Sequence, residues 1–113
     1  MILRKGNVGW CELNGENYEQ KGVRPCVVCQ NNAGNKYSTT TIIVPLTAST
    51  TKAKLPVHVK IDSKYFGNPK FQDSIALFEQ VRVIDKSRII SIEGKILSRN
   101  VMEQIDRALI PHL

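Results

Sequence analysis

Arg24 and Thr47 are the side chains in this sequence best suited to act on a phosphodiester. A guanidinium offers a fixed fork of N–H donors that matches phosphate oxygens and keeps its charge at any accessible pH. A neighbouring hydroxyl can hydrogen-bond the oxyanion that develops at a pentacoordinate phosphorus. RNA brings its own nucleophile, the 2′-hydroxyl, so this pair predicts cleavage of RNA, and not of DNA, without a protein nucleophile.

Arg24 lies on one predicted strand, and Thr47 directly follows a second predicted strand that neighbours it. Val23–Gln30 and Thr39–Leu46 are rich in β-branched residues, as strands are. Between them, residues 31–36 (NNAGNK) predict a turn, because Asn and Gly tolerate positive φ. The sequence therefore predicts a hairpin with Arg24 and Thr47 near its open end.

A hairpin symmetric about this turn pairs positions whose numbers add to about 71, because directly opposed residues of antiparallel strands share a face. Val27 then faces Val44, and Arg24 faces Thr47. Periodicity alone favours a structural interpretation, in which the Arg bonds carbonyls at the strand end and the Thr caps a turn. The catalytic interpretation needs the register as well as the residue types.

Neither strand alternates between apolar and polar residues. Val23–Cys29 and Ile42–Leu46 are apolar on both faces, unlike a half-solvated antiparallel strand. Both faces must therefore be covered, one by the core and the other by a helix or a second copy of the chain. We expect a homodimer.

The cysteines and histidines do not form a metal site by spacing. Cys26 and Cys29 form a Cys-x-x-Cys pair, but on a strand positions three apart point to opposite faces. His58 and His112 stand alone, so no second pair of ligands is available. The odd number of cysteines, without a secretory signal, predicts buried free thiols in a reducing compartment. We expect no metal and no cofactor.

The remaining segments predict a small β-rich fold. The 113 residues suffice for one domain, residues 1–113, but not for a separate cofactor domain. The C-terminus predicts a helix with Ser98 as its N-cap and Pro111 at its end. The other predicted strands are Asn7–Leu13, Val57–Ile61, Ser74–Phe78, Val81–Ile84 and Ile89–Glu93. Six or seven short strands and one terminal helix predict a mainly β fold, a strongly bent SH3-like barrel.

Composition restricts the partners. Sixteen Lys and Arg against ten Asp and Glu give a formal net charge of +6, which favours a polyanion as ligand. No apolar run approaches the ~20 residues that a membrane-spanning helix needs, and no signal peptide is apparent, so we expect a cytoplasmic protein.

Several motifs, in order from about Arg4 to Leu109, resemble the MazF/PemK family of toxin endoribonucleases. They are Gly22-Val-Arg-Pro25, Val28-Cys-Gln-Asn-Asn32 with Gly34-Asn-Lys36, Val44-Pro-Leu-Thr47, Lys52-Ala-Lys-Leu-Pro56 with His58-Val59 and Ile61-Asp62, and Glu79-Gln-Val-Arg82 with Ile84-Asp-Lys86 and Arg88. The resemblance implies a CcdB/PemK-type barrel with a C-terminal helix, assembled as a homodimer.

The resemblance also implies an activity and its residues. It implies sequence-specific, metal-independent cleavage of single-stranded RNA by 2′-OH attack, which leaves a 2′,3′-cyclic phosphate and a 5′-OH. Arg24 would bind phosphate and transfer protons, and Thr47 would stabilise the transition state. The residues at positions that line the RNA groove are Gln20, Asn31, Lys54, Glu79, Gln80 and Arg88. The implied partners are an antitoxin, whose acidic tail occludes the groove, and operator DNA bound together with the antitoxin.

The general base stays open. Arg titrates far above a working pH, so Arg24 suits electrostatic stabilisation better than proton abstraction. The titratable alternatives near the expected groove are Glu12, Glu16, Glu19 and His58.

Two departures from the family pattern affect specificity. Residues 65–72 form a longer loop than expected, and Tyr18 offers a ring on which an unpaired base could stack. The cleavage motif therefore does not transfer.

Two other functions compete with RNA cleavage. A gyrase-inhibiting toxin of the CcdB type acts through a C-terminal Trp-Gly-Ile, whereas this chain ends in Ile110-Pro-His-Leu113. The second alternative is a basic barrel that binds nucleic acid without cutting it.

Overall fold

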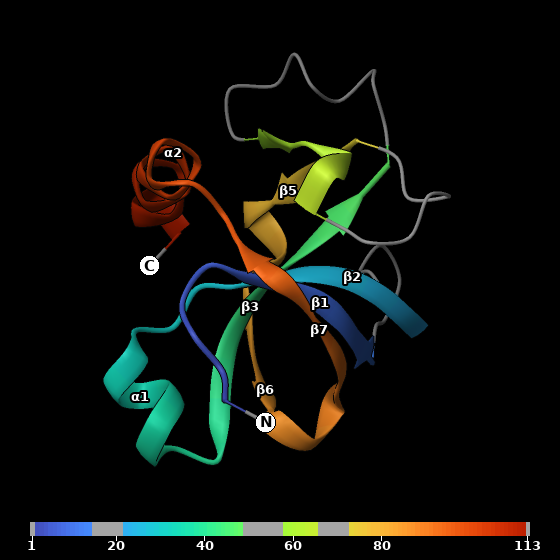
Figure 1. Cartoon of the computed structure of the whole chain (residues 1–113), viewed down its shortest axis with the longest axis vertical. Coiled ribbons are helices and arrows are strands. Elements are labelled where there is room, and N and C mark those ends of the chain that lie inside the picture. The colour runs from blue at the N-terminus through green and yellow to red at the C-terminus, as the bar shows by residue number, and fades with distance from the viewer. Residues whose placement is uncertain (1, 15–21, 49–57, 66–72, 113) are drawn as a thin grey trace.

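The computed structural model describes residues 2–14, 22–48, 58–65 and 73–112, and seven strands lie in this part of the chain (Figure 1). They are β1 (Asn7–Leu13), β2 (Gly22–Val28), β3 (Thr40–Thr47), β4 (His58–Ile61), β5 (Ser74–Leu77), β6 (Arg82–Asp85) and β7 (Ile89–Ile96). They form one curled antiparallel sheet in the order β4-β5-β3-β2-β1-β7, with β6 also paired to β3. The mainly β fold with a C-terminal helix is confirmed.

The predicted register of the central hairpin is confirmed where β2 and β3 pair. Val27 lies opposite Val44, and the flanking pairs Cys26–Pro45 and Val28–Ile43 follow the same register. A hydrogen bond of 2.8 Å from the Cys29 amide to the Ile42 carbonyl continues it. The register holds because one residue of slip would turn every side chain to the other face of the sheet.

The sheet has an apolar core on each face, which is why its central strands do not alternate. Val27 and Cys29 pack on one face with Val44 and with Ile105 and Leu109 of the C-terminal helix; we call this the helix-side core. The second core on the other face comprises Leu3, Cys11, Leu13, Cys26, Val28, Ile43, Ile84 and Ile89. The expectation that both faces are covered is confirmed, and a helix covers the first.

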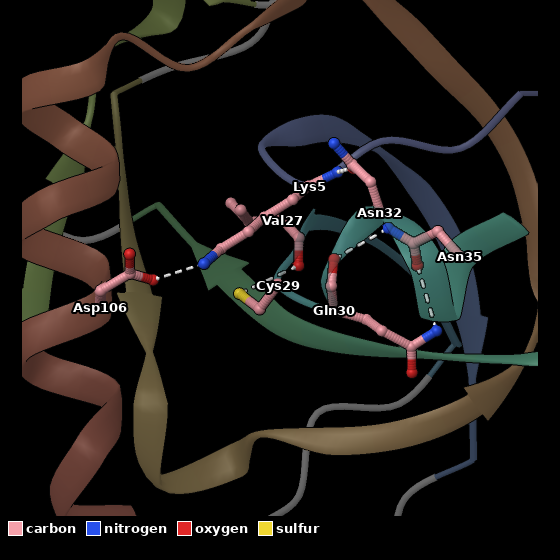
Figure 2. Close-up of polar contacts among 7 residues, drawn as sticks. All are labelled: Lys5, Val27, Cys29, Gln30, Asn32, Asn35 and Asp106. Carbon is pink, nitrogen blue, oxygen red and sulfur yellow. Dashed lines mark hydrogen bonds and ion pairs between the residues drawn. The ribbon is translucent and has the colours of Figure 1, made fainter.

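The connection between β2 and β3 differs from the predicted turn. Residues 32–37 form a short helix, α1 (Asn32–Tyr37), and Gly34 lies within it instead of at positive φ. The Asn31 side chain caps this helix by accepting a 2.8 Å hydrogen bond from the Gly34 amide. Buried Asn35 donates to the Gln30 carbonyl at 2.8 Å (Figure 2). It also accepts from the Thr41 hydroxyl at 2.7 Å. The composition of this segment is typical of a turn, but these tertiary hydrogen bonds stabilise it as a helix.

The interpretation of all three cysteines as free thiols is wrong for two of them. Cys11 on β1 and Cys26 on β2 form a disulfide, with their Cα atoms 6.7 Å apart. Cys26 lies opposite Gly9 and Arg24 lies opposite Cys11, so the two cysteines are diagonal neighbours on one face. Cys29 is free and buried in the other core, which confirms that Cys26 and Cys29 point to opposite faces.

The C-terminal helix α2 (Arg99–Leu109) begins as predicted, with the Ser98 hydroxyl accepting from the Val101 amide. A 3₁₀ turn that contains Pro111 follows it. An ion pair of 3.1 Å between Lys5 and Asp106 ties the helix to the N-terminal segment (Figure 2). None of the helices in the described ranges is long and apolar enough to cross a membrane.

Candidate active site

Arg24 and Thr47 lie at the end of the central hairpin, just beyond its paired part. The β2–β3 ladder runs from Val28–Ile43 to Cys26–Pro45. Extending it by two residues sets Arg24 across from Thr47, on the face of the second core that Cys26 and Ile43 share. The Arg24 side chain is exposed and the Thr47 side chain is half-buried, so this end of the second core opens to solvent.

The local sequence explains why the hairpin opens there. Pro25 lacks the N–H that would point to Leu46 of β3, so the β2–β3 pairing ends at Cys26–Pro45. Gly22 opens β2 with φ +80°, a conformation that L side chains rarely adopt. Beyond the prolines, Arg24 pairs with Cys11 of β1 and Thr47 with Ile75 of β5. β1 and β5 lie on the outer edges of the hairpin, so each of the two residues has a partner strand on the side away from the other.

A second group of polar residues gathers at Asn14, the residue after β1. Arg82 of β6 donates from Nη1 to the Asn14 carbonyl at 2.8 Å. With its amide oriented toward the donors that face it, Asn14 accepts from both Nη atoms of Arg88, at 2.9 and 3.3 Å. Asn14 therefore contacts two guanidiniums that come from separate segments.

Arg82 also contacts the predicted RNA-binding residue Gln80. Its Nε donates to the Gln80 carbonyl and its Nη2 to the Gln80 side-chain oxygen, both at 3.4 Å. Gln80 and the exposed Glu79 form the 3₁₀ turn Phe78–Gln80, which directly precedes Val81 and β6. The predicted RNA-binding residues Glu79 and Gln80 thus lie in the turn before β6, and Arg88 lies in the turn after it. Arg82 contacts Gln80 and Asn14, and Asn14 in turn contacts Arg88.

Arg88 lies in the 3₁₀ turn Lys86–Arg88, whose N-cap is Asp85. The Asp85 carboxylate accepts a 2.8 Å hydrogen bond from the Ser87 amide. This bond, with a smaller contribution from the Arg88 charge, lowers the pKa of Asp85 below its ordinary value. The turn that carries Arg88 is therefore capped by a carboxylate that stays ionised at neutral pH.

The structure does not bring Asn31 to this group. It follows the opposite end of β2 from Arg24, and seven residues of extended chain correspond to about 20 Å. Its side chain caps α1. Within one copy of the chain, Asn31 therefore lies beyond one end of β2 and Arg24 lies within the other end.

Several predicted residues fall outside the described part of the chain, namely Gln20, Lys54, Glu16, Glu19, Tyr18 and residues 66–72. Tyr65 is buried, and its hydroxyl accepts a 3.1 Å hydrogen bond from the Ser98 amide. This residue of the 65–72 loop therefore supports α2. The backbone of His58 pairs with Leu77.

Glu12 is poorly placed to act as the general base. It lies between Cys11 and Leu13, both of which point into the second core. Because alternate residues of a strand face opposite sides, Glu12 points away from the face that carries Arg24. In the described ranges, no group of three His, Cys, Asp or Glu side chains is arranged to hold a metal ion.

Sequence reasoning missed Asn14 and singled out Arg82 only as part of a family motif. Asn14 begins a polar loop (NGEN) and carries no pattern of its own. Its role depends on a contact with a residue 68 positions away, which no local signal contains.

Comparison with known proteins identifies the family of this chain. Residues 4–113 match the sequence model of the family described as PemK-like, MazF-like toxin of type II toxin-antitoxin system. The chain belongs to this family. It is 44% identical over 112 residues to "Endoribonuclease EndoA" of Bacillus subtilis (strain 168), a match that covers 96% of this chain and 92% of that protein.

Solved structures of the family share the fold. MazF (Form-I) from Deinococcus radiodurans superposes with a TM-score of 0.78 at 18% identity, covering 99% of this PemK/MazF chain and 96% of that one. An endoribonuclease in complex with its cognate antitoxin from a mycobacterial species gives a TM-score of 0.68 at 21% identity, covering 97% and 91%. At these identities the matches establish the fold, which is that of the MazF toxins.

Proposed function

We propose that this member of the MazF/PemK endoribonuclease toxin family cleaves single-stranded RNA, with Arg24 and Thr47 as its catalytic residues. The observation that carries the proposal is the β2–β3 register. It pairs Cys26 with Pro45, and extending it by two residues would set Arg24 across from Thr47 at the open end of the second core. The 44% identity to a protein named an endoribonuclease supports the same activity.

The reaction needs no group from outside the RNA and the protein. The 2′-oxygen attacks the adjacent phosphorus as its proton passes to a base, and the bond from phosphorus to the 5′-oxygen breaks. The products are a 2′,3′-cyclic phosphate and a 5′-OH, which takes up a proton. Arg24 binds the phosphate through its fork of donors, and the Thr47 hydroxyl donates to the oxyanion. No step is assigned to a metal ion.

An extended RNA would reach beyond these two residues. Glu79, Gln80 and Arg88 lie on the segments joined through Arg82 and Asn14, where they would bind neighbouring nucleotides. Asn31, which follows the far end of β2, would bind nucleotides farther along the RNA. Gln20 and Lys54 complete the proposed RNA-binding set.

We infer that the chain acts as a cytoplasmic homodimer held inactive by an antitoxin. Ile2, Tyr37 and Val83 expose 80%, 79% and 64% of their surfaces, which suits burial against a second copy. Family members have been solved with an antitoxin, including MazE-MazF from Deinococcus radiodurans. An acidic antitoxin tail suits the net charge of +6 and would compete with RNA. We extend the proposal to operator DNA bound jointly with the antitoxin.

A single-atom change in the substrate tests the proposed reaction. An RNA that the purified protein cuts is remade with deoxyribose at the nucleotide 5′ of the cut. We expect cleavage at that position to disappear while cleavage at other sites in the same RNA continues. Continued cutting at the deoxyribose would rule out 2′-OH attack, and binding without any cleavage would favour the non-catalytic alternative.

A further inference from the structure

Asn14 contacts two arginines, Arg82 through its backbone and Arg88 through its side chain. Arg82 belongs to β6 and shares its face with Ile84, whereas Asn14 directly follows Leu13 of β1. β1 and β6 are not hydrogen-bonded neighbours in the sheet. The 2.8 Å bond from Arg82 to the Asn14 carbonyl therefore links β6 to the end of β1, a strand with which it does not pair.

We propose that Asn14, anchored through its backbone by Arg82, is a positioning residue that presents the Arg88 guanidinium to a phosphate of the RNA. The backbone carbonyl of Asn14 is held by Arg82, and its side-chain oxygen accepts from both Nη atoms of Arg88. One residue thus fixes the place and the orientation of Arg88. This inference rests on the proposed function, because it takes RNA as the ligand.

The chemistry of an amide suits this task. An amide oxygen offers two lone pairs and no net charge, so it orients a guanidinium without neutralising it. A carboxylate would hold the same two donors more tightly but would cancel the charge that a phosphate needs. Elsewhere on the surface, Lys5 and Lys60 are paired with the carboxylates of Asp106 and Asp73, as is usual for structural pairs. The Asn14 oxygen that accepts from Arg88 is neutral, which favours a binding role.

Prior orientation of Arg88 would raise affinity for a simple reason. A long side chain that is ordered only on binding loses rotamer freedom at that moment. Two hydrogen bonds to Asn14 remove part of this cost in the free protein while leaving other N–H donors of the guanidinium for phosphate. The gain should therefore appear in RNA affinity and should require Arg88.

The test is a double-mutant cycle read by RNA binding. Binding of a fluorescent RNA with deoxyribose at the cut site is measured by anisotropy over a range of salt concentrations. The variants are Asn14→Ala, Asn14→Asp, Arg88→Ala and the double variant Asn14→Ala/Arg88→Ala. Asn100→Ala, an exposed Asn on α2, is the matched control. Thermal unfolding checks that each variant keeps its fold.

We expect Asn14→Ala to weaken binding about five-fold, with an unchanged salt slope, because the Arg88 charge remains. Asn14→Asp and Arg88→Ala should each lower the slope of log Kd against log salt concentration by about 0.7, the value for one phosphate contact on a single strand. In the Arg88→Ala background, Asn14→Ala should have no further effect. Asn100→Ala should bind as the wild type does.

Two results would overturn the positioning role: equal losses from Asn14→Ala with and without Arg88, or no loss from Asn14→Ala in the wild-type background. Failure of the proposed function looks different, because the wild-type protein would then leave an unmodified RNA uncut, whether or not it binds the modified one.

Discussion

Replacement of Arg24 by alanine tests the catalytic assignment most sharply, because the side chain is exposed and its loss should not affect folding. Surface substitutions outside special features change the free energy of unfolding by less than about 0.5 kcal/mol. Loss of a donor to a transition-state oxyanion costs about 3–4 kcal/mol, a factor of 10² to 10³ in kcat. We therefore expect Arg24→Ala to lose at least that factor while unfolding at the wild-type temperature.

Two further variants and a double variant separate the effects of charge, of side-chain geometry and of joint binding to one phosphate. Arg24→Lys keeps the charge but loses the planar fork, so its rate should lie between those of the wild type and Arg24→Ala. Thr47→Val is isosteric and removes the hydroxyl that donates to the oxyanion, which should lower kcat by a factor of about 10². If both side chains bind one phosphate, the loss in the double variant is smaller than the product of the two separate losses.

The assay is single-turnover cleavage of one RNA, with thermal unfolding measured on the same samples. The matched controls are Arg107→Ala on α2 and Thr39→Val just before β3, both at exposed positions. They should cleave at the wild-type rate. A folded Arg24→Ala protein that cleaves as fast as these controls would refute the assignment. Strictly multiplicative losses would refute the proposal that Arg24 and Thr47 act on the same phosphate.

Three other perturbations have defined outcomes. Cleavage should continue in excess EDTA, and a rate lost to the chelator and restored by a divalent ion would contradict the metal-independent mechanism. Gly9→Ala should destabilise the protein by about 1–3 kcal/mol, because its Cβ would collide with the Ser91 carbonyl and lie 3.2 Å from the Ile92 Cα; Gly94→Ala, with nothing within 4 Å of its Cβ, should not. Burial raises the pKa of Cys29 from 9.0 to about 12, so the unfolded chain loses this proton first, and stability should fall as pH rises from about 9 to 12. Urea titrations at pH 8 and 10 should show this fall in the free energy of unfolding in the wild type and a smaller fall in Cys29→Ala. An equal fall in both proteins would exclude Cys29 as its cause.

The central hairpin could be predicted because its constraints are local and strong. Val27 and Val44 lie on segments that are apolar on both faces, and a one-residue slip would expose or bury whole rows of side chains. The same register predicts that Arg24 lies across from Thr47. The N-cap of α2 was predictable for a similar reason, since Ser98 directly precedes a strong helical pattern.

Other features depend on contacts that the sequence does not display. Residues 32–37 read as a turn, yet buried Asn35 fixes them as a helix through Gln30 and Thr41. The bond between Cys11 and Cys26 follows from the β1–β2 register, which the long connecting segment at residues 14–21 does not specify. Likewise, Asn14 acquires a role only because the curl of the sheet brings β6 across to the end of β1.

The chemical structure of the fragment ends tests the central claim most directly. A mixed RNA pool is digested with the purified protein in EDTA, and the ends on both sides of each cut are identified by mass spectrometry and end-specific ligation. Attack by the 2′-oxygen at a phosphate held by Arg24 and Thr47 predicts 2′,3′-cyclic phosphates paired with 5′-hydroxyls at every cut. Fragments that carry 3′-hydroxyls and 5′-phosphates would show that water or another external nucleophile attacked, and the account would be wrong.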